Sequence, residues 1–166
     1  MDAVLRLHRM WLSNPSEGRQ AELFGAPLNS ENFTGADLRR LLAAGASFHE
    51  ARFYDSDLTG SDVTAAEFYH ARLHHSNLRD VKARDATFAG ARIDHCDFSG
   101  ALLAGANFAR AYIVQCNFRG ADLRDCDFRE VRIKSGDFRG ANLRGSKGLT
   151  SEQLAQTITD ETTILP

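Results

Sequence analysis

Every fifth residue from Leu23 to Leu143 is large and apolar, without an insertion, and only Ala43 and Ala83 depart from this rule. A period of five matches neither the 3.6 residues of an α-helical turn nor the two-residue alternation of a strand. Because an internal repeat outweighs local propensity, the chain must form a coil with its own regular geometry. This period constrains the fold more than any other feature of the sequence.

A second column of small residues precedes each large residue by two positions, and Ala, Ser, Cys or Gly occupies nearly all of it. One large and one small inward position per repeat predict a narrow tube that is filled by its own side chains. Where the large position shrinks to Ala43 or Ala83, the small position grows to Leu41 or Val81. This exchange keeps the inner volume constant, as close packing requires.

Glycine recurs at one fixed register, two residues after the large position. It stands there at positions 25, 35, 45, 60, 90, 100, 105, 120, 140 and 145. Glycine at a fixed register indicates a backbone corner that needs an unusual φ. Each pentapeptide therefore reads as a short extended side followed by a corner.

Two segments carry a resemblance to a known family. The segments ADLRD from Ala121 and ANFAR from Ala106 come close to a pattern of Ala, Asp or Asn, Leu or Phe, any residue, and Gly, and differ from it only at the last position. On these residues the chain resembles the pentapeptide-repeat family over most of its length. The resemblance implies an all-β fold, a right-handed quadrilateral parallel β-helix with four pentapeptides per turn, in which residues twenty apart stack.

The large residues independently support a turn of twenty, because like residues recur at that spacing, as a solenoid core with identical neighbours should show. At four pentapeptides per turn the repeat predicts about six coils, and about 4.8 Å between neighbouring strands makes a rod on the order of 30 Å long. The predicted core consists of Phe48, Phe68, Phe88, Phe98, Phe108, Phe118, Phe128, Phe138, Ile93, Ile113, Ile133, Leu103, Leu123 and Leu143.

The ends of the rod require caps, because a solenoid otherwise exposes unpaired strand edges and an apolar cross-section. We expect an N-terminal cap over residues 1–20, the solenoid over 21–147 and a C-terminal cap over 148–166. An amphipathic helix over 2–13 should lie on the first coil with Trp11 as its anchor; alternatively, it binds a partner. Its apolar face comprises Ala3, Val4, Leu7, Met10 and Trp11.

The C-terminal cap has its own signals. Thr150 to Gln153 resembles a capping box that begins a short helix through about Thr157, with Leu154 facing inward. The segment 164–166 should return over the last coil. Because relatives that bind topoisomerases often dimerise through C-terminal apolar contacts, the resemblance also implies a possible homodimer here.

Composition excludes several classes of function. Lys plus Arg number 20 and Asp plus Glu 22, a net charge of −2, so electrostatics argues against both nucleic-acid binding and an acidic DNA mimic. The N-terminus is too charged for a signal peptide, and the longest apolar run is too short for a membrane span. We expect a cytoplasmic protein that does not contact membranes.

Three cysteines, an odd number without metal-type spacing, agree with a reducing compartment. Cys96, Cys116 and Cys126 all fall in the small inward column, where cysteine behaves as a small buried apolar residue. Stacking would also bring Cys96 and Cys116 within disulfide range, although parallel side chains give poor torsion. We expect three buried free thiols.

Histidines and acids gather at one corner of the predicted stack. Asp55, His75 and His95 form one outward ladder, and His74 and Asp94 lie in the ladder beside it. Imidazoles on neighbouring coils next to a carboxylate can hold Zn²⁺ or Ni²⁺. The alternative is a solvated polar corner, and we expect no cofactor.

A basic residue follows the large position in six successive repeats. This band consists of Arg119, Arg124, Arg129, Lys134, Arg139 and Arg144. Asp122, Asp127 and Asp137 can pair with it, so the band serves either mutual solvation or docking of an acidic protein surface or nucleic acid.

These features favour a non-catalytic module that binds another protein through rigid, flat sides. No nucleophile is paired with a base and no phosphate-binding loop is present, so we expect no enzyme. The family resemblance implies an alternative, protection of the topoisomerase DNA gyrase by mimicry of DNA. A third possibility is an immunity or adaptor protein for a toxin.

Overall fold

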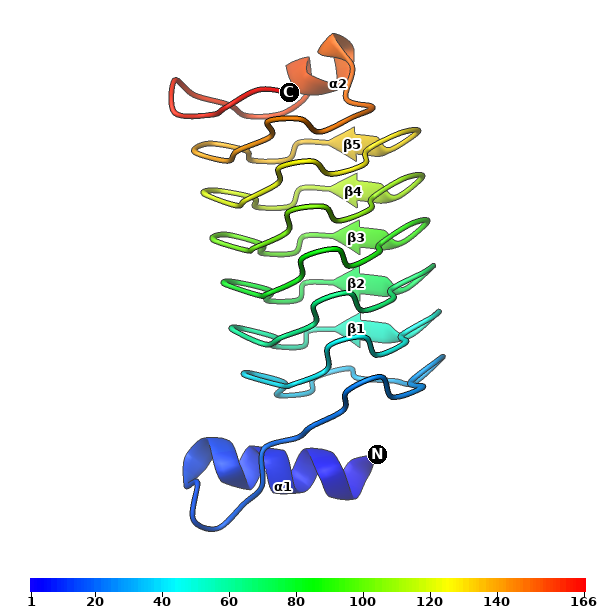
Figure 1. Cartoon of the computed structure of the whole chain (residues 1–166), viewed down its shortest axis with the longest axis vertical. Helices are drawn as coiled ribbons and strands as arrows, with labels where there is room; N and C mark the ends of the chain where they lie inside the picture. The colour runs from blue at the N-terminus through cyan, green and yellow to red at the C-terminus, as the bar shows by residue number, and fades with distance from the viewer.

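The chain folds into a parallel β-solenoid, as the sequence predicted. A computed structural model describes all 166 residues. Five short strands stack in one parallel sheet in chain order, one above another along the rod (Figure 1). They are β1 (Arg52–Tyr54), β2 (Arg72–His74), β3 (Arg92–Asp94), β4 (Tyr112–Val114) and β5 (Arg132–Lys134).

The register between neighbouring coils is twenty residues on every side of the rod. Phe53 pairs with Leu73 in the sheet, and isolated bridges of the same spacing occupy the other sides, from Glu22 with Leu42 to Asp127 with Lys147. The continuous strand ladder from β1 to β5 covers four turns, fewer than the six coils predicted. The rest of the repeat is joined by isolated bridges and not by strands, so the strand ladder is shorter than the solenoid.

Every side chain of the predicted core is buried, with an exposed fraction of 5% or less. Phenylalanine rings stack face to face along the rod, for example Phe48 on Phe68 with ring centres 4.8 Å apart. Leu41 and Ala43 are both fully buried, which agrees with the predicted exchange of volume between the two inward columns.

The glycine corners have the positive φ that the sequence predicted, between 60° and 75° at the ten repeat positions. Fifteen further corners hold a residue other than glycine at positive φ, among them the five residues that follow the strands of the sheet, with φ between 50° and 54°. These five residues are Asp55, His75, His95, Gln115 and Ser135. Ladder hydrogen bonds hold the strained backbone; for example, the His75 amide donates to the Asp94 carbonyl over 3.0 Å.

The N-terminal helix α1 (Asp2–Ser13) lies across one end of the rod as predicted, but most of its predicted apolar face does not pack on the first coil (Figure 1). Val4, Leu7 and Met10 remain 38–41% exposed, and Trp11 is only half-buried, with the Arg40 guanidinium 4.8 Å from its ring. The fully buried residue of α1 is His8.

His8 is buried because the first coil presents unpaired backbone groups, and a buried backbone group needs a polar partner. Its Nδ1 accepts a hydrogen bond from the Ala21 amide over 3.0 Å, and its Nε2 lies 2.9 Å from the Arg39 carbonyl oxygen. One neutral imidazole, protonated at Nε2, satisfies both groups. An apolar anchor such as Trp11 could not do this.

This contact makes the stability of the N-terminal cap depend on pH. Burial lowers the pKa of His8 below its ordinary value of about 6.5, and the Arg39 carbonyl and the Asp37 charge oppose the shift only in part. Because the unfolded chain then binds more protons than the folded one, stability is complete above about pH 6.5 and falls as the pH drops toward the folded-state pKa.

We expect the melting temperature of the wild type to fall more steeply below about pH 6.5 than that of a His8→Gln variant, which lacks the titrating ring. Differential scanning calorimetry from pH 8 to pH 5 measures this. The other five histidines are present in both proteins, so the comparison isolates the effect of His8. Parallel curves for the two proteins would contradict the assignment.

The C-terminal cap continues the ladder beyond the last repeat. Thr150 and Gln153 form the predicted capping box of helix α2 (Ser151–Ala155), which ends two residues earlier than expected. The Phe138 amide donates to the Ile158 carbonyl and the Leu143 amide to the Ile164 carbonyl, each over 2.7 Å. The final segment therefore covers the last coil as predicted. No helix of the chain is both long enough and apolar enough to traverse a bilayer.

Candidate functional site

The outer face of the sheet carries a column of arginines. The middle residue of each strand points into the core, so the first residue points to solvent, as strand alternation requires. The twenty-residue register therefore aligns these first residues along the rod. They are Arg52, Arg72, Arg92, Tyr112 and Arg132. We call Arg52, Arg72, Arg92 and Arg132 the arginine ladder.

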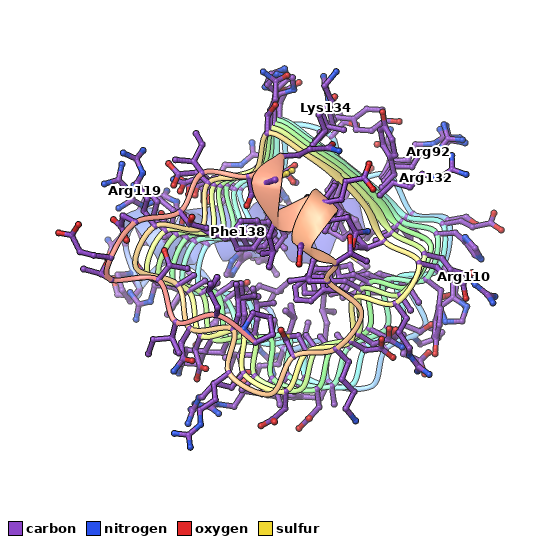
Figure 2. The ribbon with its side chains drawn as sticks, turned by 90° about the horizontal axis from the view of Figure 1, so that it is seen from above. Arg92, Arg110, Arg119, Arg132, Lys134 and Phe138 are labelled. Carbon is purple, nitrogen blue, oxygen red and sulfur yellow. The ribbon has the colours of Figure 1, made fainter.

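None of the four ladder arginines has a carboxylate within 4.0 Å, whereas seven other arginines of the chain form ion pairs. Successive rungs lie about 4.8 Å apart, so like charges accumulate without local compensation. Seen down the axis, Arg92 and Arg132 project from the same side of the rod (Figure 2). The ladder is thus an exposed cationic strip on a rigid sheet.

The predicted basic band has a different geometry. Arg124, Arg129 and Arg139 each bind the aspartate two residues earlier, for example Arg139 Nη2 with Asp137 Oδ2 over 2.6 Å. These guanidinium hydrogen bonds lower the pKa of the three carboxyl groups, Asp122, Asp127 and Asp137. This pairing is the mutual solvation that the sequence offered as one alternative.

The band also winds around the rod instead of forming one surface. A step of five residues moves to the next side, so Arg119 projects from the side that follows the sheet, while Lys134 shares the ladder's side (Figure 2). Arg119, Lys134 and Arg144 have no carboxylate partner within 4.0 Å. The role of the band as a docking surface remains a prediction, and only Lys134 lies next to the ladder.

Basic residues followed in steps of five do not reveal the arginine ladder, because each step moves to another side of the coil. The available signal was Arg in steps of twenty, at 52, 72, 92 and 132, always one residue before the large position. Only this spacing collects residues on one side of a four-sided coil.

The side of the rod that follows the sheet is acidic. Its column comprises Asp37, Asp57, Asn77, Asp97, Asn117 and Asp137. Three of its four carboxylates form ion pairs: Asp37 with Arg39 over 2.7 Å, Asp97 with Arg79 over 3.7 Å and Asp137 with Arg139 over 2.6 Å. The rod therefore presents an uncompensated basic face beside a largely compensated acidic one.

The predicted histidine corner does assemble. One ligand nitrogen from each of His74, His75 and His95 lies within 4.8 Å of the others. Asp94 contacts two of these rings, with Oδ2 at 2.9 Å from Nδ1 of His74 and Oδ1 at 2.8 Å from Nδ1 of His95. Asp55, the other candidate ligand, is not part of the cluster.

The three cysteines are buried and free of disulfides, as predicted. Burial raises the pKa of the Cys126 thiol to about 12. The pKa of Cys96 is also raised, first by its hydrogen bond with Cys116 and then by burial. Thiols with raised pKa values are poor nucleophiles, so the cysteines fill space in the core.

Two families match the sequence. The pentapeptide repeat region matches residues 32–108, and pentapeptide repeats in 8 copies match residues 106–145. No protein with a curated description matches significantly.

Several solved structures are similar in fold. Two trypsin-treated variants of QnrB1, a plasmid-mediated fluoroquinolone resistance protein, align with TM-scores of 0.54 and 0.52 at 16% identity, over 87% of this chain and 77% of theirs. HetL, involved in heterocyst differentiation regulation in the cyanobacterium Nostoc sp. strain PCC 7120, aligns at 21% identity over 95% of this chain and 77% of its own, with a TM-score of 0.33. At such identities the likeness to QnrB1 shows the fold alone.

Proposed function

Because this chain belongs to the pentapeptide-repeat family, whose solenoid fills its own interior, we propose that it is a non-catalytic module that binds an acidic protein surface. The arginine ladder carries the proposal. Four unpaired guanidinium groups project in register from one rigid sheet, so the backbone that carries them loses little conformational entropy on binding.

An acidic protein fits this face better than nucleic acid does. The ladder is one strip of four cations on a chain of net charge −2, and its neighbouring side carries the acidic column. A duplex carries phosphates well beyond one strip, and the neighbouring side has no unpaired cations in register to meet them, whereas a carboxylate-bearing patch can match the strip alone. Bidentate pairing with carboxylates is the geometry that guanidinium groups favour.

The proposal predicts that reversing the ladder charges removes binding to an acidic polypeptide. For an Arg72→Glu/Arg92→Glu variant we expect affinity for fluorescent poly-L-glutamate to fall about tenfold or more, and wild-type binding to weaken as salt is raised. Fluorescence anisotropy measures both effects. Thermal stability should change little, because both side chains are exposed.

An Arg124→Glu/Arg129→Glu variant is the matched control, since it changes the net charge equally but alters arginines that are already paired. Equal losses in the two variants would show that net charge, not the ladder, governs binding. Tighter wild-type binding to a DNA duplex than to poly-L-glutamate would overturn the proposal in favour of nucleic acid.

Gyrase protection is the alternative function, and the similarity to the QnrB1 fold together with the acidic column favours it. The basic ladder and the local pairing of Asp37 and Asp137 argue against it, because a mimic of DNA needs uncompensated negative charge. A supercoiling assay with gyrase, with and without a fluoroquinolone, distinguishes the two functions.

A further inference from the structure

The histidine cluster lies where the sheet ends and the backbone turns. His74 is the last residue of β2, and His75 follows it at φ 50°, while His95 occupies the same corner one coil later at φ 53°. The positive φ fixes the direction in which both corner side chains leave the backbone. Three imidazoles therefore converge because of the register, without a long loop that would have to be ordered.

Asp94 holds two of the three rings in one orientation. Its two oxygens contact Nδ1 of His74 and Nδ1 of His95 at 2.9 and 2.8 Å; because a carboxylate only accepts, the neutral form of each ring carries its proton on Nδ1. The Nε2 atoms of both rings make no hydrogen bond and keep their lone pairs. His75 makes no hydrogen bond through either nitrogen, and its ring centre lies 4.8 Å from that of His95.

A carboxylate that accepts from the Nδ1 proton of metal-binding histidines is the usual second layer of a metal site, because it fixes the tautomer and increases the basicity of the ligand. We propose that His74, His75 and His95 bind one divalent transition-metal ion, and that Asp94 is a positioning residue for two of these ligands. Three protein nitrogens leave a fourth tetrahedral position for water or a group from a partner.

The surroundings select the class of metal. Ca²⁺ and Mg²⁺ need several oxygen ligands, whereas this cluster offers imidazoles with one carboxylate already engaged. Because Arg72 and Arg92 line the same surface hollow as His74 and Asp94, the site has no excess negative charge, so coordination by the imidazole nitrogens must hold the ion. Imidazole nitrogens suit Zn²⁺, Ni²⁺ and Cu²⁺, and we assign Zn²⁺ as the probe of this class. The site does not depend on the arginine ladder having a partner.

Isothermal titration of the metal-free protein with Zn²⁺ tests the proposal. We expect saturable binding of one ion per chain, and no saturable binding by a His75→Gln or a His95→Gln variant. His49→Gln is the matched control, because His49 is another exposed histidine with a carboxylate partner, Glu67, outside the cluster. It should bind Zn²⁺ like the wild type. Circular dichroism of each variant verifies that the solenoid is folded.

The positioning role of Asp94 has a separate readout. An Asp94→Asn variant should bind Zn²⁺ about 10–100-fold more weakly. In the metal-free variant, ¹⁵N chemical shifts should show that His74 and His95 no longer favour the Nδ1-protonated tautomer. A merely structural role for Asp94 would leave these shifts unchanged.

Absence of saturable Zn²⁺ binding by the wild type would overturn the site, as would equal affinity in the His75→Gln and His49→Gln variants. Zn²⁺ binding that is unaffected by Asp94→Asn would overturn the positioning role. Neither result would bear on the proposed docking of an acidic surface, which is measured without metal.

Discussion

Replacing Phe108 with alanine is expected to lower the free energy of unfolding by about 3–5 kcal/mol. The ring is fully buried and lies between two others in the stack, 5.0 Å from Phe88 and 5.2 Å from Phe128, with interplanar angles of 6° and 5°. Its edge also contacts the Phe118 ring on the opposite wall. Removing it opens a cavity that the adjacent coils cannot fill.

Collapse is restricted because the ladder fixes the backbone. The Phe108 amide donates to Asp127 and the Ala111 amide donates to Phe108, so the walls cannot move inward without losing hydrogen bonds. Urea denaturation followed by circular dichroism measures the effect. A Leu102→Ala variant is the control, since Leu102 is 36% exposed on an outer side and should change stability by less than about 0.5 kcal/mol. Similar midpoints for the two variants would contradict the account of the core.

Replacing Gly148 with alanine is expected to detach the C-terminal cap and cost about 2–4 kcal/mol. Gly148 has φ +89°, and an added Cβ would lie 2.4 Å from the Arg129 nitrogen and 2.5 Å from its Cα. These are backbone atoms of the coil beneath, so no side-chain rotation relieves the collision. Leu149, which packs on the core directly after Gly148, would be displaced.

A Gly120→Ala variant is the control that separates the steric collision at position 148 from the strain of placing alanine at a positive φ. Gly120 also has a positive φ, +66°, but nothing lies within 4 Å of an added Cβ, so we expect a cost of only about 1 kcal/mol. Urea denaturation compares the variants, and limited proteolysis should release the segment after Gly148 only in Gly148→Ala. Equal stability losses and equal resistance to protease would show that the cap is not seated as described.

The two proposed surfaces share one structural cause. The arginine ladder and the histidine cluster both arise where the sheet repeats with a register of twenty, so chemistry that is dispersed along the sequence is gathered on one side. A filled solenoid offers its exterior for recognition, and its rigidity fixes the spacing of that chemistry. Neither surface requires a cavity in the rod.

The sequence by itself determined the solenoid, its two inward columns and the glycine corners. Each repeat meets nearly identical neighbours, so the position of a residue within its pentapeptide decides whether it is buried. The compensation of Ala43 by Leu41 could be read in the same way. The tertiary structure decided which charges are free, since Arg124 is paired with Asp122 whereas Arg92 has no partner, and only side-chain distances distinguish them. It also decided that His8, not Trp11, seats the N-terminal helix, because that contact occurs once and satisfies backbone groups that no sequence period reveals.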